Sequence, residues 1–262
     1  MPSIAVMALS GGMDSTCLLL RLLREGHEVT ALSFDYGQRH RMELERASAN
    51  VQFLRSRGLP VVQRHVDPRS AMATLDSALT DHEATMPEGH YEESQMKQTV
   101  VPNRNAVFAS MLYATALSLA GQRDGRARVA LGVHSGDHAI YPDCRPEFYE
   151  ALGHAFKVGN WDAEHVSFDL PYLDLDKAGI LRDALDSCND LGLDFDRVLA
   201  NTLTSYMPDE QGRSAGTTGS DVERILAFHD IGRVDPIRYV RPWNEVLQHA
   251  LDLRKTHEEG MG

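Results

Sequence analysis

The sequence is short of cysteine and of positive charge, and each shortage excludes a class of protein. Its 262 residues include three cysteines, Cys17, Cys144 and Cys188, which lie far apart and form no CxxC pair. This pattern argues against a disulfide framework and a thiolate metal site, and it fits a reducing, cytoplasmic environment. Acidic residues outnumber basic ones by 38 to 26, for a net charge of −12. That charge disfavours nucleic acid as a partner and favours a small molecule or a protein.

Long hydrophobic runs are also missing. The segment before Asp14 has no basic start, and its apolar stretch, residues 4–9, ends close to Gly11 and Gly12. We therefore expect neither a signal peptide nor a membrane-spanning helix, and no membrane as a partner. With 42% hydrophobic residues, the chain is long enough to bury the core of one large domain with an appendage.

Short apolar runs alternate with amphipathic helical patterns along the chain. The runs have strand length, although periodicity alone does not separate them from buried helical segments; they cover residues 4–9, 29–34, 61–66, 129–133 and 166–170. Helical patterns cover residues 14–24, 39–57, 105–120, 145–158, 177–191 and 221–231. The alternation predicts an α/β fold, a doubly wound and mostly parallel five-stranded sheet with helices on both faces and a helical C-terminal extension.

Two segments interrupt this alternation. Residues 80–99 are polar without an apolar period, which is typical of a lid or an insertion. Residues 209–219 form a loop rich in Gly, Ser and Thr. We therefore predict a main domain over residues 1–206 and a packed extension over residues 207–262.

The sharpest motif is SGGMDST at residues 10–16, between the first strand and the first helix. Its glycines let the backbone approach an anion closely, and the start of the helix supplies unpaired N–H groups with a positive dipole end. The motif therefore predicts a phosphate-binding loop; the alternative is an ordinary glycine-rich turn with a capping residue. It is neither the GxxxxGK[ST] loop, since it has no lysine, nor GxGxxG.

This loop resembles that of the PP-loop ATP pyrophosphatases, whose fold is of the HUP (adenine nucleotide alpha hydrolase-like) type. Further strings narrow the resemblance: FDYGQRH at 34–40, VPNRN at 101–105, YPDCRPEF at 141–148 and TLT at 202–204. In order and spacing they resemble the 7-cyano-7-deazaguanine synthase (QueC-like) family of queuosine biosynthesis, over residues 4–206.

The resemblance implies an ATP-dependent carbon–nitrogen ligase. The carboxylate of 7-carboxy-7-deazaguanine attacks ATP, pyrophosphate leaves, and an amine converts the acyl-adenylate into an amide. In the synthases the amine is ammonia, and a second ATP dehydrates the amide to a nitrile. ATP and Mg²⁺ are therefore the expected cofactors, and the family makes a homodimer possible.

Residue roles follow from the motifs and the resemblance. The expected catalytic residues are Asp14, which also provides the ligand for Mg²⁺, Arg39, Arg104 and Lys177; either arginine alone is as readily a surface ion-pair partner. For ATP binding we expect Leu9, Ser10, Gly11, Gly12, Met13, Asp14, Ser15, Thr16, Phe34 and Gly132. For binding the deazaguanine substrate we expect Tyr36, Gln38, Asn105, Asp137, Tyr141, Asp143 and Arg145.

Asp143 is the expected reader of the base, because one carboxylate accepts hydrogen bonds from both N1–H and the 2-amino group of a guanine edge. Tyr141 would stack on the base, and Arg145 would pair with Asp143 or with the substrate carboxylate. The alternative for Asp143 is a cap on the following helix. His134, His138 and His154 have no metal-ligand spacing and are expected to be core or solvated histidines.

The sequence departs from the family at the structural zinc site. At the positions that we match to its four cysteines stand Ser205, Ser214, Thr217 and Ser220, so we expect no zinc. The residues Ala139-Ile140 also differ from the family pattern. These departures favour a zinc-less paralogue of the antiphage-defence branch (CBASS type), which delivers the deazaguanine to the N-terminal amine of a partner protein. The alternatives are a true synthase that uses ammonia and an ATP-binding regulator without chemistry.

Overall fold

The structure is a computed structural model that describes residues 3–38, 42–75, 100–138, 141–205 and 208–260. Arg39, the segment 80–99 and the pair Ala139-Ile140, all singled out in the sequence, lie outside these residues. In the described part, no helix is both long enough and apolar enough to cross a membrane.

Five parallel strands form one sheet in the order β3-β2-β1-β4-β5. The strands are β1 (Ile4–Ala8), β2 (Glu28–Phe34), β3 (Val61–Val66), β4 (Ala127–Ala130) and β5 (Val166–Asp169). The chain runs from β1 outward to β3 and then crosses back to β4 on the other side of β1. Ligand sites in such sheets form at the carboxyl ends of the strands where this reversal occurs, here between β1 and β4. The predicted doubly wound α/β fold is confirmed.

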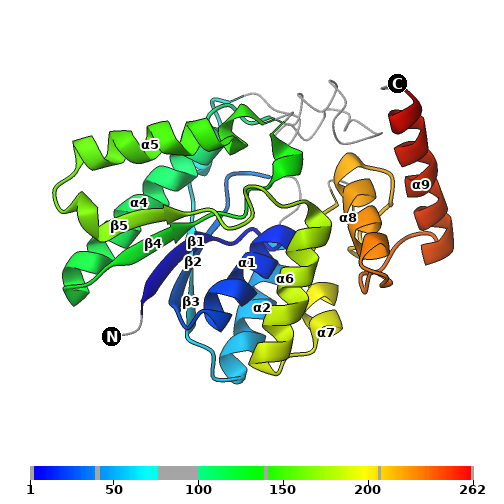
Figure 1. Ribbon diagram of the computed structural model, residues 1–262, viewed down its shortest axis with the longest axis horizontal. Helices are drawn as coiled ribbons and strands as arrows, with labels where there is room; N and C mark the ends of the chain where they lie inside the picture. The colour runs from blue at the N-terminus through cyan, green and yellow to red at the C-terminus, as the bar shows by residue number, and fades with distance from the viewer. Residues whose placement is uncertain (1–2, 39–41, 76–99, 139–140, 206–207, 261–262) are drawn as a thin grey trace.

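Helices cover both faces of the sheet (Figure 1). One face carries α1 (Met13–Arg24), α2 (Met42–Ser56) and α6 (Lys177–Leu191), and the other carries α4 (Arg104–Arg123) and α5 (Pro146–Gly159). Alternate residues of β1 face opposite cores: Ala5 and Met7 pack with α1 and α6, whereas Ile4 and Val6 pack with α4. Burial on both faces explains the unbroken apolar run of this strand.

The remaining helices are short or belong to the C-terminal segment. They are α3 (Arg69–Met72), α7 (Phe195–Ala200), α8 (Gly219–Asp230) and α9 (Trp243–Gly260), with 3-10 turns η2 (Ser135–Asp137), η3 (Pro142–Cys144) and η4 (Ala163–His165). The sequence did not predict α3 or α7. It also placed the fourth strand at residues 129–133, whereas β4 ends at Ala130 because the next residues leave the sheet and line the site.

The C-terminal extension packs against the main body of the fold, with α8 between α6 and α9 (Figure 1). Val222 and Ile225 of α8 form a small buried cluster with Val246 and Ala250 of α9. Phe228 belongs instead to the large core that α1 and α6 share. A helical extension is thus present, and the division of the chain at residue 206 stays a prediction.

Candidate active site

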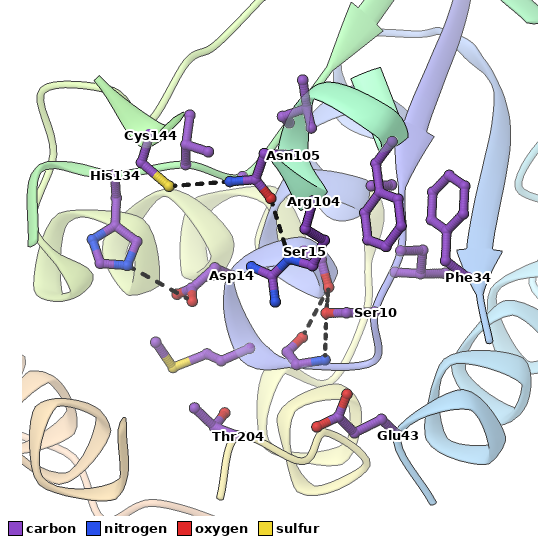
Figure 2. Close-up of a pocket in the computed structure, with 18 of the residues that line it drawn as sticks. Ser10, Asp14, Ser15, Phe34, Glu43, Arg104, Asn105, His134, Cys144 and Thr204 are labelled. Carbon is purple, nitrogen blue, oxygen red and sulfur yellow. Dashed lines mark hydrogen bonds and ion pairs between the residues drawn. The ribbon is translucent and has the colours of Figure 1, made fainter. Parts of the chain in front are cut away.

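A cavity of about 290 Å³ opens at the carboxyl ends of β1, β2 and β4. Most of the residues expected at the site line it: Leu9, Ser10, Gly12, Met13, Asp14, Ser15, Phe34, Tyr36, Gln38, Arg104, Asn105, Gly132, Tyr141 and Lys177. Figure 2 shows His134 and Asp14 on one side of the cavity and Phe34 and Glu43 on the other.

The loop after β1 is shaped by a contact with α2. Gly11 has φ 94°, and a Cβ atom there would lie 2.0 Å from the carbonyl oxygen of Glu43, so only glycine fits. The Ser10 and Ser15 hydroxyls lie 3.0 Å apart, and the Gly12 N–H donates to Ser10 Oγ at 3.2 Å. Gly11 and Thr16 do not line the cavity. They shape the loop instead, and the Thr16 hydroxyl donates to the Gly12 carbonyl at 2.8 Å.

Asp14 is the charged centre of the site. Its Oδ2 atom lies 3.2 Å from Lys177 Nζ and 4.0 Å from His134 Nε2. Burial raises the pKa of Asp14, but Lys177 and His134 outweigh burial and hold this pKa below its ordinary value. The Gly136 N–H donates to His134 Nδ1 at 3.2 Å, and this contact orients the ring so that its Nε2 atom faces Asp14.

An aromatic wall lies across the cavity from Asp14. The rings of Phe34 and Phe108 stack with centroids 4.0 Å apart, and the guanidinium of Arg104 lies 5.9 Å from the centroid of the Tyr36 ring. Gln38 shapes this wall, because its Nε2 donates to the Phe34 carbonyl at 3.1 Å and its Oε1 accepts from the Tyr36 N–H at 3.0 Å. A flat heterocycle fits against such a surface.

Two residues expected to bind the deazaguanine substrate, Asp143 and Arg145, do not line the cavity. Asp143 does not line it, and its Oδ2 accepts from the Asn105 N–H at 3.3 Å, so the carboxylate binds the start of α4 and not that of α5. Arg145 is exposed, does not pair with Asp143 and donates to the His138 carbonyl at 2.9 Å. The backbone of Asp137 lies in η2, and the structure does not describe its side chain.

Sequence reasoning missed several residues of the site. His134 is a core histidine, as expected, yet it faces Asp14; its place directly after the fourth strand was the available signal. Glu43 lines the cavity from α2, and burial raises its pKa to about 8 while Arg104 opposes the shift. Nothing in the charged pattern of residues 39–57 singled it out. Thr204 and Ser220 also line the cavity.

The residues at the positions that we match to the family's zinc site form a hydrogen-bonded cluster around the Asp221 carboxylate. Ser214 Oγ donates to Asp221 Oδ1 at 2.6 Å, and Ser205 Oγ and the Thr218 N–H donate to Oδ2, each at 3.2 Å. The hydroxyls of Ser220 and Thr218 lie 3.1 Å apart. Thr217, the remaining position matched to a cysteine, makes no hydrogen bond among the described residues; Thr218 and Asp221, which were not singled out in the sequence, complete the cluster.

Asp14 meets the requirements for a magnesium ligand. Its Oδ1 atom is buried and has no hydrogen-bond partner among the described residues. Mg²⁺ takes one or two protein carboxylates together with substrate phosphates, so a larger ligand group is not needed. Within the described ranges, no three His, Cys, Asp or Glu side chains are grouped around a common metal position.

Comparison with known proteins gives a consistent result. The sequence profile described as "Queuosine biosynthesis protein QueC" matches residues 4–232. The 7-cyano-7-deazaguanine synthase 1 of Colwellia psychrerythraea is 45% identical over 236 residues, which are 89% of this chain and 97% of that protein. The 7-cyano-7-deazaguanine synthase of Methanoregula boonei is 40% identical over 235 residues, 90% of this chain and 98% of its own.

Among solved structures, the NMN synthetase from Francisella tularensis aligns with a TM-score of 0.40 and 13% identity, over 97% of this chain and 85% of that one. This likeness is too remote to bear on function. The family profile and the curated relatives cover nearly the whole fold and all of the cavity. The chain belongs to the family of the queuosine biosynthesis protein QueC.

Proposed function

We propose that this protein uses ATP to activate the carboxylate of 7-carboxy-7-deazaguanine and joins it to an amine as an amide. The observation that carries the proposal is the cavity itself, in which a glycine-rich loop with Asp14 and Lys177 lies across from an aromatic wall. The names of the curated relatives, 7-cyano-7-deazaguanine synthases, support the deazaguanine as the substrate class.

The residues of the site fit the first half-reaction. An oxygen of the substrate carboxylate attacks the α-phosphorus of ATP, and pyrophosphate leaves. The loop N–H groups and the ammonium of Lys177 offset the charge of the phosphates, and Arg104 lies beside the aromatic wall where the charged carboxylate would approach. Mg²⁺, bound through Asp14 and the phosphates, would neutralise further negative charge.

The second half-reaction needs an amine that attacks the acyl carbon, loses a proton and expels AMP. The names of the relatives support a cyano product, for which the acceptor would be ammonia; a second ATP would then activate the amide oxygen, which leaves with AMP as the nitrile forms. We include the N-terminal amine of a partner protein in an antiphage defence system as a second acceptor. Its motive is that hydroxyl residues stand at the positions that we match to the family's four cysteines, and one of them, Ser220, lines the cavity.

The test is pyrophosphate release from Mg-ATP with 7-carboxy-7-deazaguanine, with and without ammonium, followed by mass spectrometry of the small-molecule products. Formation of the free nitrile supports the synthase. Release that stops at the acyl-adenylate or the amide supports a protein amine, which is then sought as added mass on a partner with a free N-terminus. No pyrophosphate with any carboxylate would leave only an ATP-binding regulator.

A further inference from the structure

Lys177 has a second carboxylate partner, and that partner comes from the C-terminal extension. Glu223 of α8 places Oε2 3.0 Å from Lys177 Nζ, while Asp14 Oδ2 lies 3.2 Å from the same nitrogen. The Lys177 side chain is 6% exposed and each carboxylate 21%. One nearly buried ammonium therefore lies between two carboxylates from opposite ends of the chain.

Buried polar contacts on both sides of Glu223 fix α8. Arg224 and Asp235 form an ion pair with Nε and Oδ2 2.6 Å apart and both side chains 0% exposed. Arg224 also donates to the hydroxyls of Thr202 and Thr204 at 2.8 and 2.9 Å. Two residues before Glu223, Asp221 anchors the serine cluster. This segment of α8 can move little, so the Glu223 carboxylate is presented at a defined place.

Gly136 leaves the space that the Glu223 carboxylate fills. A Cβ atom on residue 136 would lie 2.5 Å from Glu223 Oε1, well inside van der Waals contact. The same turn presents His134, whose ring would lie 3.0 Å from that Cβ. The loop after β4 and the helix α8 are therefore fitted to each other at the carboxylate.

We propose that Glu223 is a positioning residue that shares the ammonium of Lys177 with Asp14, so that the C-terminal extension takes part in ATP binding. The inference rests on the proposed function. If Asp14 were the single carboxylate beside the buried Lys177, the two would form an ion pair, and neither group would be available to phosphate or Mg²⁺. With Glu223 as a second partner, the Lys177 ammonium can leave Asp14 and turn toward a phosphate of ATP. The Glu223 carboxylate still balances the charge of the ammonium.

The test is calorimetric binding of α,β-methylene-ATP in the presence of Mg²⁺ to the full-length protein, with thermal unfolding of each ligand-free variant. Glu223→Gln keeps the size and removes the charge, and we expect about tenfold weaker binding, equal to about 1.4 kcal/mol. Glu223→Asp keeps the charge and should restore most of the affinity. Glu245→Gln, at an exposed residue of α9, is the matched control and should bind as the wild type does.

Two further variants separate positioning from other effects. In a Lys177→Met background, Glu223→Gln should change the affinity by less than about twofold, because the partner through which Glu223 acts is gone. Gly136→Ala should displace the Glu223 carboxylate without altering it and weaken binding as Glu223→Gln does. Adding Glu223→Gln to Gly136→Ala should cost little more.

The outcomes distinguish this inference from the proposed function. A wild-type protein that does not bind the analogue overturns the proposed function and the inference with it. Wild-type binding that Glu223→Gln leaves unchanged overturns the inference alone. Tighter binding by Glu223→Gln in both backgrounds also overturns it, because the carboxylate then acts only by repelling phosphate.

Discussion

Lys177 Nζ lies 3.2 Å from Asp14 Oδ2 although 163 positions of sequence separate the two residues. Asp14 lies in the first turn of α1, and Lys177 is the first residue of α6. Both helices begin at the carboxyl edge of the sheet, which brings the two charges together over the cavity. The contact brings the SGGMDST motif, which predicts phosphate binding, next to a lysine that the sequence offered only as a candidate.

Replacing Asp14 by Asn should abolish turnover and leave the fold intact. The variant loses the charge that compensates Lys177 and that would bind Mg²⁺ in the proposed mechanism, so we expect pyrophosphate release at least about 100-fold slower. Asp190→Asn, at an exposed residue of α6, is the control and should retain wild-type release. Wild-type-like release by Asp14→Asn, with an unchanged thermal midpoint, would remove Asp14 from the mechanism.

Asp143→Ala should distinguish a base-reading role from the capping role seen in the structure. The carboxylate accepts from the Asn105 N–H, so its loss should lower stability by about 1 kcal/mol, as for a lost helix cap. If Asp143 also turns to the base when substrate is bound, KM for the deazaguanine rises while ATP affinity is spared. Varying the concentration of each substrate separately measures KM for the deazaguanine and KM for ATP. An equal loss for the two would mean that Asp143 acts only as a cap.

The fold was predictable from local signals, and the site only in part. β1 was recognisable because an unbroken apolar run, residues 4–9, ends just before the SGG of the loop. Glu223 was not, because its role arises from Gly136 and Lys177, which only the folded chain brings near it. The contact of Asp143 was not predictable for a related reason: its chemistry suits a guanine edge, whereas the backbone N–H that it accepts from lies 38 positions away in the sequence.

Glu43 should make stability depend on pH between about 4.5 and 8. Burial raises its pKa from an ordinary value of 4.5 to about 8, while Arg104 opposes the shift. Over this range the folded state binds the proton more tightly than the unfolded state, so the free energy of unfolding falls as pH rises. Glu43→Gln imitates the protonated form and should lose less stability between pH 5 and pH 8. Parallel curves for the two proteins from denaturant unfolding would contradict this.

The serine cluster predicts a protein that does not depend on zinc. Elemental analysis of the purified protein should find no stoichiometric zinc, because hydroxyls of Ser205 and Ser214 already satisfy the one carboxylate among them. Treatment with a chelator should leave the thermal midpoint unchanged. One equivalent of zinc, or a midpoint that falls on chelation and recovers with added zinc, would refute the prediction.

The buried pair of Arg224 and Asp235 should hold the extension in place. Arg224→Met leaves the Asp235 carboxylate, whose side chain is 0% exposed, without its guanidinium partner and loses the hydrogen bonds to Thr202 and Thr204. We therefore expect a loss of about 3–5 kcal/mol in the free energy of unfolding by urea. Arg254→Gln breaks an exposed pair with Asp230 on the same extension and should cost less than about 1 kcal/mol. Equal losses for the two variants would mean that burial adds nothing to the Arg224 pair. A transition in two steps for Arg224→Met would mean that the extension unfolds by itself. ATP binding should then weaken at the first step, where Glu223 leaves Lys177.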